Sequence, residues 1–239
     1  MKKIPFVILH GWNLNSKKFT SLSNSLSKMG YRVYCPDLPG FGKSNKPEKS
    51  FKLDDYLFFV VNFLKQNNIN KANFICHSFG GRIGIKLAVI NPEKINKLIL
   101  TGVPGIPPVP REKVIFFLLL AKLGKLIFSL PFLSVFKNIS QKVLYKLAGA
   151  SDFYHTDQHL RETFQNVVSE KLTFLLAKIT VPTFLIWGRQ DSLVPISIAK
   201  KMKRLIPKSC LIIVNGVGHA FVYENTDIFI KYLRPVINK

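Results

Sequence analysis

The sequence predicts an α/β fold, with a mostly parallel central sheet flanked by helices and an all-helical cap insertion. Three observations predict it. Short apolar runs rich in β-branched residues alternate with segments of helical periodicity along most of the 239 residues. Several of these runs are continuously apolar, as strands buried on both faces of a parallel sheet must be. The alternation is interrupted once, between about residues 102 and 180, where no run is typical of a strand.

The elements follow in order along the chain. Six runs are candidate strands: Ile4–Leu9, Arg32–Cys35, Ala72–Cys76, Ile95–Thr101, Pro182–Trp187 and Cys210–Asn215. Apolar residues at helical spacing lie between or after them, over residues 19–29, 53–64, 82–90, 196–205 and 228–233. Repeated strand–helix–strand units imply right-handed crossovers, and therefore an open α/β sheet.

The interruption opens with a proline-rich stretch over residues 104–110, which neither a helix nor a strand tolerates. Helical segments rich in Phe and Leu follow it. An all-helical insertion of this kind is typical of a cap over the strand ends. We therefore expect residues 1–103 and 179–239 to form the two parts of one core, and residues 104–178 to form a helical cap or lid.

The composition excludes several classes of protein. A hydrophobic content of 47%, with 20 Phe, is enough for a buried core and excludes disorder. Three cysteines in the whole chain are too few for a disulfide-stapled domain, and no two lie close enough for a zinc site. The net charge of +22 comes from 28 Lys and only 7 Arg. Proteins that bind nucleic acids rely on the bidentate guanidinium of Arg, so we expect this chain not to bind nucleic acid. The Lys residues are expected either to form a solvated surface or to dock an acidic partner.

No segment is typical of a targeting signal or a membrane span. The first apolar stretch is short, contains Pro5 and runs into His10. The most apolar region, residues 114–136, is interrupted by Lys122 and Pro131, so it falls short of the roughly 18 uninterrupted apolar residues of a span. The expectation is a cytoplasmic protein without a stable membrane span.

Ser78 is the candidate nucleophile. It lies in the stretch from Phe74 to Arg82, FICHSFGGR, where an apolar strand passes through a tight turn into a helix. A strained nucleophile elbow requires small residues two before and two after the serine, because bulky ones would clash there. Gly80 meets this requirement, whereas Cys76 stands where a glycine is usual and is small enough to fit. The alternative is a serine that only caps a helix.

A serine hydroxyl needs a base, and the base needs an orienting acid. Of the five histidines, only His219 lies on a glycine-flanked loop after the last strand. Asp191 follows the penultimate strand, so the order along the chain is Ser78, Asp191, His219. Residues that follow parallel strands project from one edge of the sheet. The alternatives are a surface-loop histidine and an aspartate that caps the helix starting near residue 196.

These residues and several motifs resemble the α/β-hydrolase-fold serine hydrolases over essentially the whole chain. The motifs are His10-Gly11-Trp12, the loop of residues 37–44 (DLPGFGKS), residues 184–188 before Asp191, and Gly218-His219. The resemblance implies that the backbone N–H groups of Trp12 and Phe79 form an oxyanion hole. It also implies a carboxylesterase that works through an acyl-enzyme, with a small-molecule ester substrate and without cofactor or metal.

The substrate is less well defined. Phe116, Phe117 and Leu120 of the insertion are expected to line a hydrophobic acyl pocket, although the apolar insertion could also pack on itself or lean on lipid. Residues 10–15 are similar to the pimeloyl-carrier-protein methyl ester esterases, whose partner is an acidic carrier protein. Residues 78–82 are similar to a pyruvate-eliminating synthase in which the arginine binds an acidic substrate, so Arg82 is a second candidate. The sequence is also compatible with a lyase or a ligand sensor that has the same triad. It is compatible with either a monomer or a homodimer.

Overall fold

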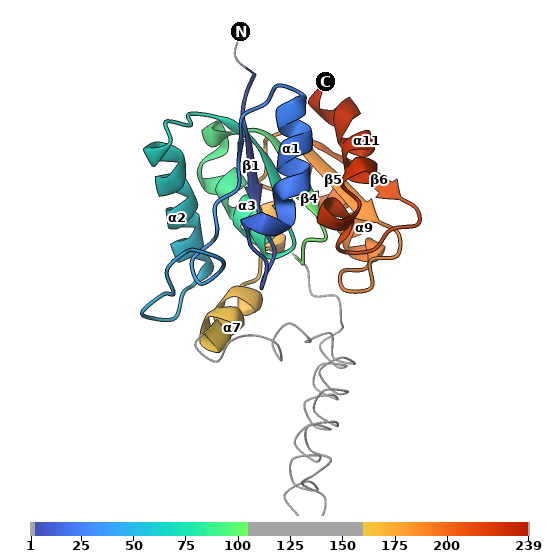
Figure 1. The fold of residues 1–239 in the computed structure, drawn as a ribbon. Helices are drawn as coiled ribbons and strands as arrows, with labels where there is room; N and C mark the ends of the chain where they lie inside the picture. The colour runs from blue at the N-terminus through green and yellow to red at the C-terminus, as the bar shows by residue number, and fades with distance from the viewer. Residues whose placement is uncertain (1–2, 105–159, 239) are drawn as a thin grey trace, which may run out of the picture.

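The computed structural model describes residues 3–104 and 160–238 of the chain (Figure 1). Six strands form one sheet in the order β2-β1-β3-β4-β5-β6, and each pair of neighbours is parallel. The strands are β1 (Phe6–Leu9), β2 (Val33–Tyr34), β3 (Ala72–His77), β4 (Ile95–Thr101), β5 (Thr183–Gly188) and β6 (Ser209–Val214). The parallel sheet expected from the sequence is confirmed. Edge strand β2 is shorter than expected, since only two of its residues pair with β1.

Helices cover both faces of the sheet (Figure 1). One face carries α2 (Leu53–Gln66), α3 (Phe79–Ile90) and α9 (Ile196–Leu205), and the other carries α1 (Thr20–Lys28) and α11 (Thr226–Ile237). Strand β1 shows why both faces are apolar. Val7 and Leu9 pack in one apolar cluster, whereas Phe6 and Ile8 pack in the cluster on the opposite face.

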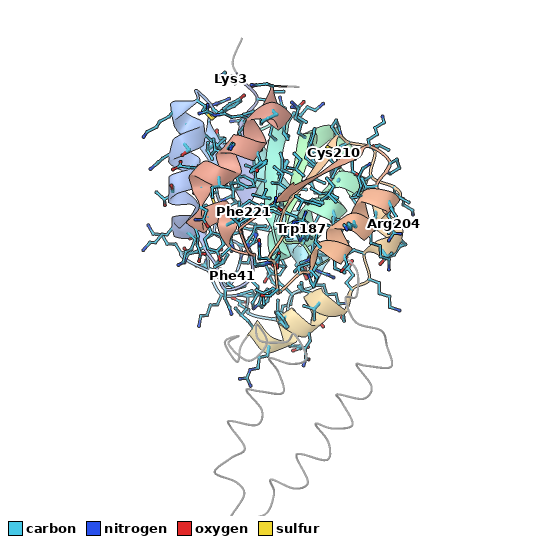
Figure 2. All side chains as sticks on the ribbon, turned by 90° about the vertical axis from the view of Figure 1, so that its right-hand side faces the viewer. Lys3, Phe41, Trp187, Arg204, Cys210 and Phe221 are labelled. Carbon is cyan, nitrogen blue, oxygen red and sulfur yellow. The ribbon has the colours of Figure 1, made fainter. Side chains whose placement is uncertain are left out.

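Helix boundaries differ from the expectations mainly at two places. Helix α3 begins at Phe79 rather than Arg82, because the turn at Ser78 leads directly into it. Helix α11 runs from Thr226 to Ile237, beyond the expected 228–233, since Phe229, Ile230, Leu233 and Val236 bury one continuous stripe. Figure 2 shows Trp187 among the buried side chains and Arg204 on the outer side of α9.

Short elements complete the described chain: the 3-10 helices η1 (Ser16–Phe19) and η2 (Pro92–Lys94), and the helices α7 (Arg161–Ser169), α8 (Thr173–Leu176) and α10 (Phe221–Glu224). Helices α7 and α8 belong to the segment in which we expect a cap, and α7 lies beyond the carboxyl ends of the strands (Figure 1). Residues 105–159 of that segment lie outside the described residues. No helix within residues 3–104 and 160–238 combines the length and the apolar character that crossing a membrane requires.

Candidate active site

Ser78 occupies the single-residue turn between β3 and α3. Its backbone has φ 49° and ψ −112°, a strained conformation for a residue with a side chain. The Ser78 N–H donates to the Thr101 carbonyl on β4 at 2.9 Å, which ties the turn to the neighbouring strand. The elbow expected from the sequence is present, and it raises Ser78 at the carboxyl edge of the sheet.

The residues around the turn explain why this sequence adopts it. A Cβ at Gly80 would lie 2.2 Å from the Leu9 carbonyl oxygen, so only glycine fits two residues after Ser78. Two residues before Ser78, the buried Cys76 side chain points toward α3. A Cβ at Gly84 would lie 2.7 Å from Cys76 Sγ. Cys76 is therefore accommodated because residue 84 on the facing helix is itself glycine.

Asp191 and His219 are joined by a hydrogen bond of 2.8 Å between Oδ2 of the carboxylate and Nδ1 of the imidazole. The other carboxylate oxygen, Oδ1, accepts from the backbone N–H groups of Leu193 at 3.0 Å and Val194 at 2.7 Å. The Asp191 side chain is 1% exposed, whereas the His219 side chain is 15% exposed. The carboxylate is thus fixed and buried, and it holds the imidazole with its second nitrogen, Nε2, available.

Hydrogen bonds to backbone carbonyls fix the two loops that carry this pair. The Gln190 N–H, next to Asp191, donates to the Val217 carbonyl at 3.0 Å, two residues before His219. The Trp187 indole Nε1–H donates to the Val194 carbonyl at 2.9 Å and closes the loop that carries Asp191. Asp191 therefore follows β5 on a loop fixed at both ends, as its place after a parallel strand predicts.

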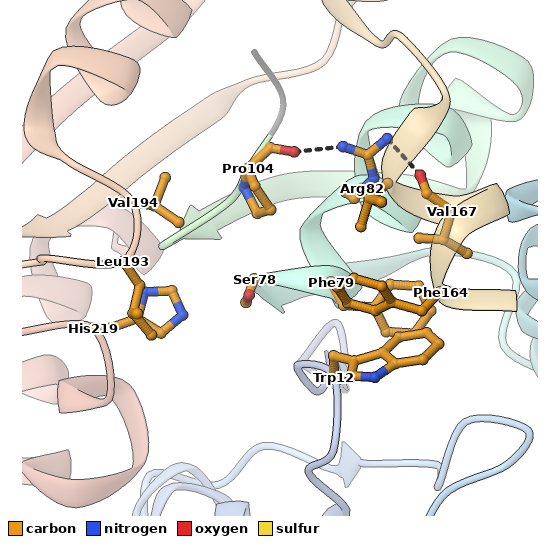
Figure 3. A pocket seen from close by; sticks show the side chains of 11 residues that line it. Trp12, Ser78, Phe79, Arg82, Pro104, Phe164, Val167, Leu193, Val194 and His219 are labelled. Atoms are coloured by element: carbon orange, nitrogen blue, oxygen red, sulfur yellow. Dashed lines mark hydrogen bonds between the residues drawn. The ribbon is translucent and has the colours of Figure 1, made fainter. Parts of the chain in front are cut away.

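Ser78 and His219 line one pocket at this edge of the sheet (Figure 3). Its remaining lining is mostly apolar and is formed by Trp12, Phe79, Arg82, Pro104, Phe164, Val167, Val168, Leu193 and Val194. The structure therefore brings all three predicted triad residues to one place, because Asp191 is bonded to His219. Arg82 and both predicted oxyanion-hole residues also line the pocket.

The two predicted oxyanion-hole residues come from different elements. Phe79 is the first residue of α3, so its N–H belongs to the group at a helix start that has no acceptor within the helix. Trp12 follows β1, and its ring packs edge-to-face against Phe41, Phe79 and Phe164 at centroid distances of 4.9 to 5.1 Å. This aromatic contact holds the Trp12 loop beside the start of α3.

His10 organises the Trp12 loop in a way that the sequence did not reveal. Its Nε2 accepts from the Leu38 N–H at 2.9 Å, so its Nδ1 carries the proton and donates to the Gly11 carbonyl at 2.8 Å. Burial lowers the pKa of His10, against the opposing effects of the Gly11 bond and Asp37. The neutral ring therefore links the loops that follow β1 and β2.

Asp37 fixes the second of these loops. Its carboxylate accepts from the backbone N–H groups of Ser16 at 2.6 Å and Lys43 at 2.8 Å. Burial alone would raise the pKa of Asp37, but these hydrogen bonds outweigh it and lower the pKa. The motif at residues 37–44 is thus a structural support for the loop of His10 and Trp12, and Asp37 does not line the pocket.

Other predicted pocket residues are not described. Phe116, Phe117 and Leu120 lie outside the described residues. The apolar lining that is described comes instead from α7, through Phe164, Val167 and Val168, and from Leu193 and Val194 beside Asp191. The apolar spacing of residues 164, 167 and 168 is helical, and it is the signal that could have identified α7 as a pocket wall.

A parallel sheet with a strained serine at the end of β3, and an Asp–His pair after later strands, defines an α/β protein with a hydrolase-type site. The chain belongs to the α/β-hydrolase family. The model of the alpha/beta hydrolase fold family matches residues 4–123 and 129–226. The likeness of the sequence to this family is thereby confirmed.

Three curated relatives illustrate the range of the family. The AB hydrolase superfamily protein YisY of Bacillus subtilis is 32% identical over 93% of this chain and 87% of its own length. A pimeloyl-[acyl-carrier protein] methyl ester esterase of Aliivibrio fischeri is 29% identical over 98% of this chain and 93% of its own. A 2-hydroxy-6-oxononadienedioate/2-hydroxy-6-oxononatrienedioate hydrolase of Cupriavidus pinatubonensis is 25% identical over 93% and 83%.

A solved structure shares the fold. The chain is similar to an esterase from Exiguobacterium antarcticum, with a TM-score of 0.76 and 23% identity over all of this chain and 93% of that one. At this identity the likeness shows the fold alone. The relatives include one named as a methyl ester esterase and one named as a hydrolase of a dienedioate, so membership of the family does not define the substrate.

Proposed function

We propose that this protein is a serine hydrolase that cleaves carboxylic esters through an acyl-enzyme, with Ser78 as nucleophile, His219 as general base and Asp191 as the orienting acid. One observation carries the proposal. His219 shares a pocket with Ser78, and its Nδ1 is held by a buried carboxylate whose other oxygen is already occupied by two backbone N–H groups. An imidazole so oriented presents Nε2 as a base in the correct tautomer.

The mechanism follows from these positions. Nε2 of His219 takes the proton of Ser78 Oγ while Oγ attacks the ester carbonyl carbon. The negative charge that develops on the carbonyl oxygen is stabilised by the backbone N–H groups of Trp12 and Phe79. His219 then gives the proton to the departing alcohol, which leaves an acyl-Ser78. Water repeats the sequence and releases the acid, so the reaction uses no cofactor.

The lining of the pocket supports an apolar acyl group as substrate. Trp12, Phe79, Phe164 and Val167 present apolar surface near Ser78, and burying such surface favours hydrocarbon over polar ligands. Three of the lining residues lie on α7 in the segment of residues 104–178, which supports the proposal that this segment acts as a cap. The esterases among the relatives support the same reaction class.

The test is hydrolysis of p-nitrophenyl esters from acetate to laurate by the wild type and by Ser78→Ala. We expect turnover by the wild type and a loss on the order of 1,000-fold or more in Ser78→Ala. The variant should unfold at an unchanged temperature, and it should not react with a fluorophosphonate that labels the wild type at Ser78. Full activity in Ser78→Ala would overturn the proposal. Labelling of Ser78 without ester turnover would favour a lyase or a ligand sensor.

A second candidate is an esterase for methyl esters carried on an acidic carrier protein. The observation that favours it is charge. The net charge is +22. Helix α9 begins two residues after the pocket residue Val194, and exposed cations lie on it and just after it. These are Lys200, Lys201, Lys203, Arg204 and Lys208, called here the α9 cationic face. An acidic carrier would be attracted to such a face at low salt.

This candidate has its own test. A methyl ester on an acidic carrier protein is compared with the same methyl ester on a small thioester. We expect a higher kcat/KM with the carrier, an advantage that disappears as the salt concentration rises and that falls when Lys200 and Lys203 are replaced by Glu. Equal rates for the carrier and the small thioester at low salt would exclude an esterase specific for carrier-bound methyl esters. They would leave an esterase for small-molecule esters as the proposed function.

A further inference from the structure

Arg82 is a buried cation on the wall of the pocket, one turn of α3 beyond Ser78. It is 5% exposed, and its guanidinium donates from Nη1 to the Pro104 carbonyl at 2.6 Å and from Nη2 to the Val167 carbonyl at 2.7 Å (Figure 3). Nη2 also donates to the Glu170 carbonyl. One side chain thus binds three main-chain carbonyls.

These carbonyls come from the two ends of the segment that we propose as a cap. Pro104 is its first residue, and Val167 and Glu170 lie near its end. The three hydrogen bonds of the Arg82 guanidinium, called here the Arg82 fork, therefore join both ends to α3. The guanidinium holds Nη1 and Nη2 apart in one plane, so they reach carbonyls of different segments, whereas a lysine carries all of its donors on one nitrogen. A lysine at position 82 would keep the charge but lose this geometry.

Lys86 continues the connection one turn farther along α3. Its Nζ lies 2.6 Å from Asp54 Oδ1, in the first turn of α2, and 2.7 Å from Glu170 Oε1. Burial alone would lower the pKa of Lys86, but the carboxylates of Asp54 and Glu170 outweigh it and raise the pKa. Glu170 is therefore bound twice, through its carbonyl by Arg82 and through its carboxylate by Lys86.

The environment of Arg82 shows that the arrangement has a cost. Burial lowers the pKa of Arg82 to about 10, with Glu170 acting in the opposite direction, so the group remains protonated at neutral pH. Its Nε is buried without a partner among the described residues. A buried donor without an acceptor is unfavourable, and the charge-assisted bonds to the three carbonyls must offset it.

We propose that Arg82 is a positioning residue that fastens both ends of the 104–178 segment to α3, and so sets the acyl group that the pocket over Ser78 accepts. Val167, whose carbonyl it binds, is itself a pocket wall, and Phe164 lies one turn earlier on the same helix. Loss of the fork releases this wall from α3. The part of the proposal that concerns acyl groups rests on the proposed ester hydrolysis, whereas the fastening does not.

The direct test is amide hydrogen exchange in the full chain, which requires no substrate. We expect amides of residues 162–170 to exchange at least about 10-fold faster in Arg82→Lys and in Arg82→Met than in the wild type, with β3 and β4 unchanged. Arg234→Met makes the same change at an exposed position of α11, on the other face of the sheet, and should leave the exchange of 162–170 unaltered. Unchanged exchange in folded Arg82→Lys would overturn the proposal.

Lys86→Met is a second, milder variant in case both Arg82 variants fail to fold. It keeps the fork but frees the Glu170 carboxylate, so exchange should increase over residues 168–171 and much less over 162–166. Because the Arg82 hydrogen bonds are intact in Lys86→Met, an increase over residues 162–166 as large as that over 168–171 would mean that Lys86 rather than Arg82 holds α7, and would overturn the proposal.

The second measurement is the acyl-chain profile with p-nitrophenyl esters. We expect KM for the preferred ester to rise about 10-fold or more in Arg82→Lys with kcat changed less than about threefold, and the preference among chain lengths to flatten. If Arg82 instead bound an anionic substrate through its charge, lysine would largely preserve that function. An unchanged chain-length profile in Arg82→Lys would therefore overturn the positioning role of Arg82. If the wild type hydrolyses no ester, the proposed function fails while the exchange experiment still decides the fastening.

Discussion

Gly102 and His219 lie in direct contact at the carboxyl end of β4. A Cβ at position 102 would be 2.6 Å from Cε1 and 2.8 Å from Nδ1 of the imidazole, and 3.4 Å from Asp191 Oδ2. The backbone of Gly102 has φ +59°, which side-chain-bearing residues rarely adopt. The main chain of residue 102 thus forms the surface against which the Asp191–His219 pair is packed.

The first prediction tests this contact with Gly102→Ala. We expect kcat on a p-nitrophenyl ester to fall at least about 10-fold, because the new methyl group displaces the imidazole from Ser78. Stability should also fall by about 1 kcal/mol from the unfavourable φ. Gly216→Ala is the matched control, since Gly216 has φ +76° with no atom within 4 Å of its added Cβ. It should lose comparable stability and keep kcat; an equal loss of kcat in both variants would contradict the role of the contact.

The second prediction concerns the carboxylate of Asp191. Asp191→Asn keeps the size of the side chain but places an amide opposite Nδ1 of His219, which favours the wrong tautomer of the imidazole. We expect kcat to fall by about 1,000- to 10,000-fold at neutral pH with the protein still folded. The measurement is steady-state hydrolysis together with thermal unfolding. A variant within 10-fold of wild type would show that His219 does not depend on this carboxylate.

Most of the sheet and the three triad residues could be predicted from the sequence, because the signals are local. Runs such as Phe6–Leu9 are apolar on both faces, and Ser78, Asp191 and His219 each follow a strand within a few residues. Parallel strands place such residues at one edge, so their proximity follows from topology without any knowledge of side-chain packing.

The remaining features could not be predicted because they depend on contacts between distant segments. His10 is read from the sequence as part of a motif, but its role depends on the Leu38 N–H, 28 residues away. Arg82 shows no signal that its guanidinium meets Val167, 85 residues away. The apolar wall formed by α7 is likewise not predicted, because residues 116–133 are more apolar in sequence than the segment around Phe164 and are the stronger candidates for a pocket lining.

The third prediction tests how Cys76 replaces the usual small glycine before Ser78. Gly84→Ala places a methyl group 2.7 Å from Cys76 Sγ and should destabilise the protein by about 1 to 3 kcal/mol. Cys76→Gly alone should also destabilise it, by creating a cavity and a more flexible strand. The double variant should lose less stability than the sum of the two losses, as measured by urea unfolding. Strict additivity would mean that the two side chains do not compete for the same space.

The fourth prediction concerns the cysteine thiols. Burial raises the pKa of Cys76, and it raises that of Cys35 to about 12, so neither presents a thiolate near neutral pH. Cys210 is exposed on β6 (Figure 2). A thiol reagent should therefore modify one group rapidly in the native protein and three after unfolding. Cys210→Ser should remove the rapid phase; a rapid phase that persists in this variant would contradict the assignment.

The last prediction is a loss of stability in mild acid caused by two buried histidines. Burial lowers the pKa of His10, and burial together with the neighbouring His219 lowers that of His77 well below the usual value. Both rings bind a proton more weakly in the folded chain than in the unfolded chain. The stability they contribute is therefore complete above about pH 6.5 and is lost as the pH falls below it toward their folded pKa values.

Each ring can contribute up to about 1.4 kcal/mol per pH unit in that range. Asp37 does not interfere, because its lowered pKa matters only at more acidic pH. Urea unfolding at about pH 7.5 and about pH 5.5 should show the lower stability at the acid end. Ring-proton spectra should show that His10 and His77 titrate below about pH 6.5 in the folded protein. Either ring titrating at about pH 6.5 in the folded state would contradict the prediction, since protonated His10 could no longer accept from the Leu38 N–H that holds the Trp12 loop.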